Sequence, residues 1–284
     1  MISVWIPTNH QFPLDASILK HNIIILQTSV SSINVLVTED TDLYPLITEF
    51  PTINFETSCS SHLHSMFHES IANKSHEIFA MYLHPLIKLD AFNPTSALSL
   101  LGKDDVFGLA GNCLFTSPEI QNVSLNGFYR AGWFYTTQPT TPLPDKSRVF
   151  SFNDFCFIID VEKYLDLHGF DPMFQGIQGS SKELCYRASL KKWPIHYDKT
   201  WTSQLAKEIK LAYAFNNDLL KQNRLGNTYL LIWKNLGLTM STLSHITWIL
   251  FMFLFFRIKH TRAILKTCFY IPRLLKNRPI DPST

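Results

Sequence analysis

Residues 153–198 have the sequence NDFCFIIDVEKYLDLHGFDPMFQGIQGSSKELCYRASLKKWPIHYD. An apolar run at each end predicts a short strand, and the segments between the runs have helical character. A Gly-Phe-Asp turn at residues 169–171 and a loop separate two predicted helices, the second of which ends at Arg187. The stretch therefore predicts strand, helix, turn, loop, helix and strand, an order typical of a layered α/β domain.

The chain N-terminal to this stretch alternates short apolar runs with longer segments of helical spacing. The predicted strands are residues 2–6, 33–37, 78–83 and 106–115. The predicted helices are residues 14–28 and 60–75. Strands that alternate with helices favour parallel pairing through right-handed crossovers. We therefore expect an α/β fold with a Rossmann-like, mostly parallel central sheet flanked by helices.

Ligands of such sheets bind beyond the carboxyl ends of the strands. In this chain those ends are Pro7-Thr8-Asn9, residues 38–42 and residues 84–86. Residues 116–150 are rich in Thr, Pro, Ser and aromatic residues. They form either a long surface loop or a small hairpin insertion. In either form the segment binds substrate or is a solvated connection.

Composition and charge narrow the class of protein. At 284 residues and 46% hydrophobic content, the chain is long and apolar enough for one large globular domain or two small ones. The net charge is +2, but seven Lys or Arg against one acid give residues 257–284 a charge of +6, which leaves −4 on residues 1–256. An acidic body with a basic tail argues against a nucleic-acid partner and favours an anionic membrane surface.

The cysteine pattern and the N-terminus indicate the cellular compartment, and the C-terminal segments indicate membrane contact. The five cysteines include no C-x-x-C pair, and residues 1–6 lack the basic start of a signal peptide, so we expect reduced thiols in a cytosolic protein. Residues 236–256 contain no Asp, Glu, Lys or Arg, and a cationic amphipathic segment follows over residues 257–278. We expect in-plane membrane attachment through residues 243–278; a single span and a buried core helix are the alternatives.

Five segments together resemble family-2-type (GT-A) glycosyltransferases of the rhamnosyltransferase-like kind. They are SVWIPTN at 3–9, VLVTED at 35–40, EIFAMYLHPLIKLD at 77–90, HGFD at 168–171 and QGSSKELCYR at 178–187. The resemblance implies a GT-A domain over residues 1–204, with a nucleotide-binding half at 1–115 and an acceptor half at 116–204. It implies a helical, membrane-associated C-terminal region at 205–284, held peripherally on the cytoplasmic face of the inner membrane.

The same resemblance implies an inverting sugar transfer from a nucleotide sugar to a lipid-linked or surface-polysaccharide acceptor. Its nucleotide-binding residues would be Pro7, Thr8, Asn9, Glu39 and Asp40. His84 would lie near the donor phosphates.

Three positions depart from the family pattern. Ser180 and Ser181 occupy the usual acidic pair, Leu86 replaces a metal-binding acid, and residues 201–204, after the last strand, contain no histidine. A serine hydroxyl cannot act as a base near neutral pH. The remaining candidates for the base are Asp171, Glu183 and Asp154. We expect no tightly held metal, although Mn²⁺ or Mg²⁺ is compatible with the family. The alternative is an inactive GT-A subunit that scaffolds polysaccharide assembly.

A histidine cluster offers a second candidate site. His64 and His68 are four residues apart on a predicted helix, with His62 just before them. Such a pair binds zinc when a third ligand converges on it, but no H-E-x-x-H motif or cysteine is nearby. A polar helix face is the default expectation.

Overall fold

The computed structural model describes most of the first 205 residues and four later ones. The described residues are 1–9, 15–39, 44–60, 62–74, 76–103, 105–114, 123–130, 133–137, 139–174 and 180–205, together with Leu231, Lys234, Thr247 and Leu250. The predicted region at 205–284 and the predicted membrane segment at 243–278 therefore lie almost wholly outside the described residues.

The N-terminal half forms a parallel sheet with connecting helices, as the alternation of runs predicts. Its strands are β1 (Ile2–Pro7), β2 (Ser32–Thr38), β3 (Asn54–Ser58) and β4 (Phe79–Leu83). Its helices are α1 (Ala16–Leu26), α2 (Tyr44–Glu49) and α3 (Leu63–Asn73). β1 pairs in parallel with β2 and β4, and β2 with β3. Neither α2 nor β3 was predicted from the sequence. The six residues of α2 make fewer than two turns and cannot show a repeated helical period, and β3 is partly exposed without a clean alternation of buried and exposed residues.

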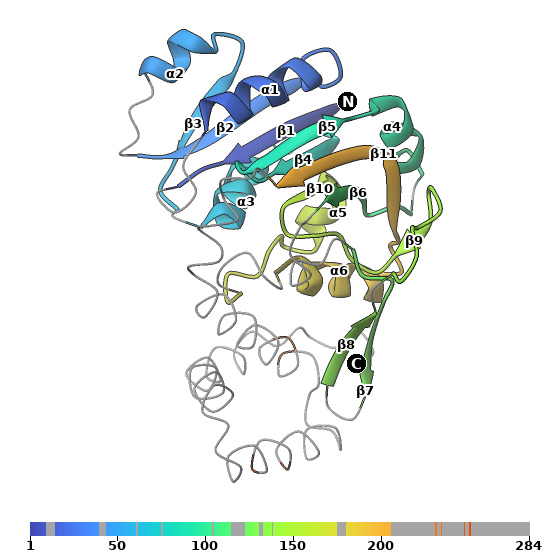
Figure 1. The fold of residues 1–284 in the computed structure, drawn as a ribbon. Helices are drawn as coiled ribbons and strands as arrows, with labels where there is room; N and C mark the ends of the chain where they lie inside the picture. The colour runs from blue at the N-terminus through green and yellow to red at the C-terminus, as the bar shows by residue number, and fades with distance from the viewer. Residues whose placement is uncertain are drawn as a thin grey trace.

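The second half completes the sheet and is not parallel throughout. Its elements are β5 (Ile87–Ala91), α4 (Pro94–Leu101), β6 (Gly108–Leu114), β7 (Asn126–Arg130), β8 (Trp133–Thr137), β9 (Arg148–Val149), β10 (Cys156–Asp160), α5 (Val161–Asp166), α6 (Ser180–Leu190) and β11 (Ile195–Leu205). The sheet order is β3-β2-β1-β4-β10-β6-β11-β5, with β9 beside β11 (Figure 1).

The central sheet is mixed, which corrects the expectation of a mostly parallel one. β10 runs antiparallel to both β4 and β6, and β11 runs antiparallel to β5 and β9 but parallel to β6. A strand buried on both faces has the same continuous apolar run in either direction, so the run in β10 does not encode its direction. The antiparallel β10 matters for function because its beginning lies at the edge where β4 ends.

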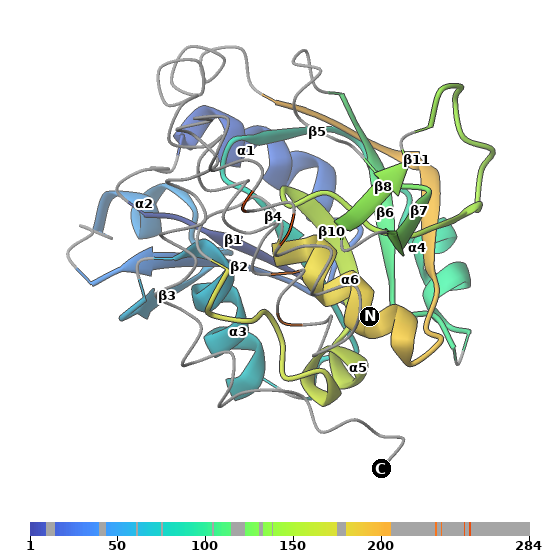
Figure 2. The same cartoon turned by 90° about the horizontal axis from the view of Figure 1, so that it is seen from below.

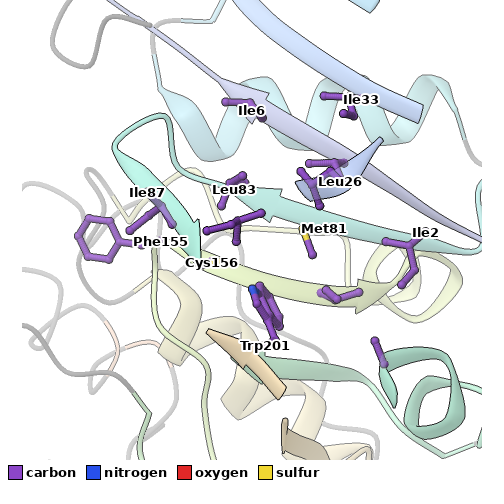
Figure 3. Close-up of a cluster of buried hydrophobic side chains, with 14 of the residues drawn as sticks. Ile2, Ile6, Leu26, Ile33, Met81, Leu83, Ile87, Phe155, Cys156 and Trp201 are labelled. Atoms are coloured by element: carbon purple, nitrogen blue, oxygen red, sulfur yellow. The ribbon is translucent and has the colours of Figure 1, made fainter. Parts of the chain in front are cut away.

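Helices cover both faces of the sheet, giving three layers (Figures 1 and 2). Side chains from alternate strand positions pack with α1 and α4 on one face and with α3, α5 and α6 on the other. Figure 3 shows the first cluster, in which Leu26 of α1 and Trp201 of β11 pack with the strand residues Ile6, Ile33 and Met81. Each fully buried aliphatic side chain contributes about 1.5–3 kcal/mol, so the two clusters hold the strand order in place.

A two-stranded hairpin, β7–β8, stands apart from the main sheet (Figure 1). It lies within residues 116–150, so the hairpin alternative is confirmed there. Phe128 pairs with Tyr135 and Gly127 with Thr136 across the two strands.

The described C-terminal residues Leu231, Lys234, Thr247 and Leu250 are helical. Among the residues that the structure describes, no helix is both long and apolar enough to cross a bilayer.

Candidate functional site

One edge of the sheet gathers the candidate nucleotide-binding residues. Because β2, β1 and β4 are parallel neighbours, their carboxyl ends lie in a row, which brings Glu39, Pro7–Asn9 and His84 to the same edge. β10 is antiparallel to β4, and Cys156 pairs with Leu83. Asp154, two residues before Cys156, therefore enters at this edge as well.

The end of β1 is fixed by its neighbour β2. Thr8 donates to the Leu36 carbonyl through its backbone N–H at 2.7 Å and through its hydroxyl at 3.1 Å. Thr8 is buried and Asn9 is half-buried. Glu39, which follows β2, is exposed and accepts a hydrogen bond from the Cys59 thiol at 3.1 Å. A rigid strand end beside an exposed carboxylate suits a nucleoside, while Asp40 lies outside the described residues.

His84, directly after β4, is fully buried and does not face the solvent. Its backbone N–H donates to the Phe155 carbonyl at 2.8 Å, and its Nδ1 accepts from the Leu86 N–H at 3.3 Å. Burial lowers the pKa of His84 well below its ordinary value, and the nearby His64 lowers that pKa further. A neutral imidazole can donate or accept a hydrogen bond at this edge but supplies no charge to neutralise a diphosphate.

The start of α6 lies against Asp154. The Ser181 N–H donates to Asp154 Oδ1 at 3.0 Å, and the Ser180 hydroxyl lies 3.5 Å from the same oxygen. The first N–H groups of a helix lack intrahelical partners and attract negative charge, so a carboxylate from another segment is stabilised there. Asp154 is half-buried, whereas Ser180 and Ser181 are buried. A carboxylate therefore lies beside Ser180 and Ser181, supplied from the segment before β10.

His64 completes this cluster from α3. Its Nδ1 and the Ser180 Oγ share a hydrogen bond of 2.7 Å. Its ring stacks on Phe170 at a centroid distance of 4.2 Å and meets Tyr82 edge-on at 5.0 Å. Burial lowers the pKa of His64, and the charge of Asp154 partly opposes this shift.

The polar-face expectation is therefore wrong for His64. The signal was present in the sequence, since His64 precedes Phe67 and Ile71 by three and seven residues and so shares their buried face. Within the described part of the chain, no three His, Cys, Asp or Glu side chains gather as a metal site would require. Leu86, which follows β4, is buried and apolar and offers no side-chain ligand to a metal. The described residues at this edge therefore do not offer the set of oxygen ligands that a divalent cation requires.

The other two candidate bases lie in an ion-pair network. Lys234 Nζ lies 2.6 Å from Asp171 Oδ2 and 2.6 Å from Glu183 Oε1. Arg187 Nη2 lies 2.6 Å from Glu183 Oε2 and donates to the Gly169 carbonyl at 2.7 Å, while Arg187 Nη1 donates to the Leu167 carbonyl. The network ties the Gly-Phe-Asp turn to α6. Ion pairs and hydrogen bonds therefore join the turn to the Glu-x-x-x-Arg segment of α6. The sequence around Lys234 has no feature that predicts its contact with these acids.

Comparison with protein-family models finds no match, and comparison with curated protein sequences finds none. Among solved structures, GalNAc-T7 with UDP, GalNAc and Mn²⁺ is similar at TM-score 0.58 and 11% identity, over 72% of this chain and 43% of that one. A putative glucose-1-phosphate thymidylyltransferase from Bacillus anthracis, in complex with a sucrose, is similar at TM-score 0.50 and 9% identity, over 77% and 96% of the two chains.

A mannosyltransferase from Pyrobaculum calidifontis, in complex with GDP-Man and Mn²⁺, has a TM-score of 0.48 and 10% identity, over 82% of this chain and 62% of that one. The chain thus spans less than two-thirds of the GalNAc-T7 and mannosyltransferase chains. The likeness to the first two structures shows that the described residues adopt a GT-A, Rossmann-like α/β fold.

Proposed function

We propose that the chain is a glycosyltransferase that moves a sugar from a nucleotide-sugar donor to a lipid-linked or surface-polysaccharide acceptor with inversion. The observation that carries the proposal is the position of Asp154. Its carboxylate lies against the N-terminus of α6, beside Ser180 and Ser181, at the edge where β1, β2 and β4 end. The GT-A fold of two structurally similar proteins, one of them with UDP bound, supports a nucleotide at this edge.

The proposed roles follow from these positions. The nucleoside lies along Pro7, Thr8 and Asn9, with the carboxylates of Glu39 and Asp40 accepting its hydrogen bonds. Asp154 Oδ takes the proton of the acceptor hydroxyl as that oxygen attacks the anomeric carbon. The bond from the anomeric carbon to the diphosphate oxygen breaks at the same time, and the nucleoside diphosphate leaves with the electron pair. His84, at the end of β4, serves as a neutral hydrogen-bonding group at the same edge.

Asp171 and Glu183 have a different role in this proposal. Both are held by Lys234, and Glu183 also by Arg187, so they position the start of α6 and take no proton from the acceptor. Residues 1–204 then form the catalytic domain. Residues 205–284 are the membrane-associated region, attached peripherally through 243–278 at the cytoplasmic face of the inner membrane or crossing it once.

A second function, a catalytically inactive scaffold subunit, is favoured by specific observations. Two of the three candidate bases are engaged in ion pairs, and the buried Leu86 stands where a metal-binding acid is usual. A scaffold would keep the nucleotide edge and lose turnover. Both functions therefore predict nucleotide binding, but only the transferase predicts turnover.

The deciding experiment measures binding and turnover on the same full-length protein. UDP, GDP and dTDP are added at about a hundredfold excess over Kd, with and without Mn²⁺; one of them should stabilise the fold by about 2.7 kcal/mol. For a chain of this size that raises Tm by about 5–10 °C. Glu39→Gln should reduce this shift, whereas Glu49→Gln, at an exposed position on α2, should leave it unchanged.

Turnover is then measured as release of nucleoside diphosphate from the matching nucleotide sugar. Release that depends on Asp154 supports the transferase. The assay uses a panel of UDP-, GDP- and dTDP-sugars with membrane lipid extract as acceptor. Nucleotide binding without release of nucleoside diphosphate from any of them would reject the transferase and support the scaffold function. No Tm shift with any of the three nucleotides would reject both functions.

A further inference from the structure

The β7–β8 hairpin has two chemically different faces. Phe128 and Tyr135 are 43% and 46% exposed, and their rings stack at a centroid distance of 5.7 Å with 22° between planes. They form a directly opposed cross-strand pair, next to the pair of Asn126 and Thr137. All four side chains are exposed, whereas Gly127 between them is half-buried. This alternation gives the hairpin one outward face of two aromatic rings beside an amide and a hydroxyl.

The inward face fastens the hairpin to the body of the protein. A Cβ atom on Gly127 would lie 2.5 Å from the Phe150 ring, so the absence of a side chain lets the strand lie against that ring. Thr136, opposite Gly127, accepts a hydrogen bond from Lys182 Nζ at 3.5 Å. Lys182 directly follows Ser181, whose N–H binds Asp154. The hairpin is thus attached at the start of α6, where the carboxylate lies.

We propose that the outward face of the hairpin, formed by Asn126, Phe128, Tyr135 and Thr137, binds the glycan part of the acceptor. This proposal rests on the proposed glycosyl transfer and adds the place where the acceptor chain is held. The C–H faces of sugar rings are apolar and pack against aromatic rings, while their hydroxyl groups need hydrogen-bonding partners. The hairpin supplies both within one face.

The chemistry of the face favours a glycan over a lipid surface. A hydrocarbon partner would leave the Asn126 amide and the Thr137 hydroxyl with only each other, and these two groups already share one hydrogen bond of 3.3 Å. An amide has two donors and an acceptor, so most of its capacity stays available to an incoming hydroxyl. Two exposed, mutually stacked rings are also a rigid platform, since only two side-chain torsions per ring must be ordered on binding.

The test is saturation-transfer NMR on the full-length protein with chitotetraose, maltotetraose, mannotetraose and a rhamnose-containing tetrasaccharide as probes. At least one probe should receive saturation at its ring C–H protons. The double variant Phe128→Leu/Tyr135→Leu keeps apolar side chains on the strands but removes both rings, and should weaken that binding about tenfold or more. The exchange Phe128→Tyr/Tyr135→Phe keeps both rings and should retain it. Leu190→Ala, at an exposed apolar residue on α6, is the matched control.

The outcomes separate this proposal from the proposed function. Nucleoside diphosphate binding, read by Tm, should be equal in wild type and the Leu double variant. If no nucleotide binds but a probe sugar still depends on the two rings, the hairpin site stands and the proposed function fails. The hairpin proposal is overturned if no probe binds, or if the Leu variant binds the probe like wild type. It is equally overturned if that variant instead loses binding to vesicles of phosphatidylcholine with phosphatidylglycerol, which would assign the face to lipid.

Discussion

Lys234 Nζ lies 2.6 Å from Oε1 of Glu183, a side chain with no exposed surface. The two residues are 51 positions apart, and the contact joins the C-terminal region to α6. Arg187 binds both oxygens of the same carboxylate, Oε1 through Nε at 2.8 Å and Oε2 through Nη2 at 2.6 Å, and Asp171 completes the set of two acids and two cations. A buried carboxylate is expensive unless it is paired, so this network depends on both cations.

Replacing Lys234 by Met should therefore destabilise the protein by about 3 kcal/mol, because Asp171 would lose the ammonium group at 2.6 Å and the buried Glu183 would lose one of its two cations. The free energy of unfolding from urea denaturation measures the loss. Lys191→Met is the control: Lys191 pairs with Asp166 at 3.3 Å, but both side chains are more than half exposed, so the cost should stay below about 0.5 kcal/mol. Equal losses in the two variants would show that the Glu183 contact is not a buried ion pair in solution.

Replacing Asp154 by Asn should lower kcat about a hundredfold or more while leaving nucleoside diphosphate binding unchanged. The amide keeps the shape of the side chain and can still accept from the Ser181 N–H, but it cannot take a proton. Asp171→Asn should show the opposite pattern, with lower stability from the lost Lys234 charge pair and kcat within about threefold of wild type. Transfer rates and Tm are compared in parallel. A larger loss of kcat in Asp171→Asn than in Asp154→Asn would move the role of base to Asp171.

Two adjacent residues at the start of the Gly-Phe-Asp turn predict stability changes of very different size. Gly169 has φ of 65°, and a Cβ there would lie 2.2 Å from His68 Nδ1 and 2.9 Å from the Tyr164 hydroxyl. Gly169→Ala should cost about 3 kcal/mol or more, from backbone strain together with the clash. His168 has φ of 58°, so His168→Gly relieves strain there and should change stability by less than about 1 kcal/mol, in either direction. Chemical denaturation of both variants checks the pair, and a Gly169→Ala variant as stable as wild type would contradict the turn geometry.

Stability should fall as the pH is lowered below about 6.5, the ordinary pKa of a histidine. Burial lowers the pKa of His84 far below that value and lowers that of His64 as well. The unfolded chain then binds more protons than the folded one, so the free energy of unfolding rises with pH in this window. The stability that the two neutral histidines contribute is lost on acidification. Each histidine contributes at most about 2 kcal/mol between pH 6.5 and 5.

His84→Asn keeps an acceptor for the Leu86 N–H and removes the titrating ring, so its urea midpoint should depend less on pH than that of wild type over this range. The exposed His76, replaced by Asn, should leave the pH dependence unaltered. Parallel curves for wild type and His84→Asn would mean that His84 takes up its proton as easily in the folded protein as in the unfolded one.

The sequence predicted β1, β2, β4, β6, α1 and α3 because each has a local signal, either a β-branched run or helical periodicity. It did not predict the direction of β10 or the short elements α2, β3, β5 and α4. The direction of β10 follows from which neighbours it meets, and that is settled by packing of the whole sheet. The same packing of distant segments gives the three carboxylates different partners: Asp154 accepts from the Ser181 N–H, whereas Asp171 and Glu183 pair with Lys234.

By itself, the sequence determined the α/β class, the parallel N-terminal half, the strand ends that form the candidate edge and the serine pair at residues 180 and 181. Each of these depends on residues within a few positions of one another. Only the tertiary structure decided that Asp154 lies at the start of α6 and that Lys234 holds Asp171 and Glu183. The reason is physical: a carboxylate acquires its role from the charges and N–H groups around it, and here those come from segments 27 to 63 residues away.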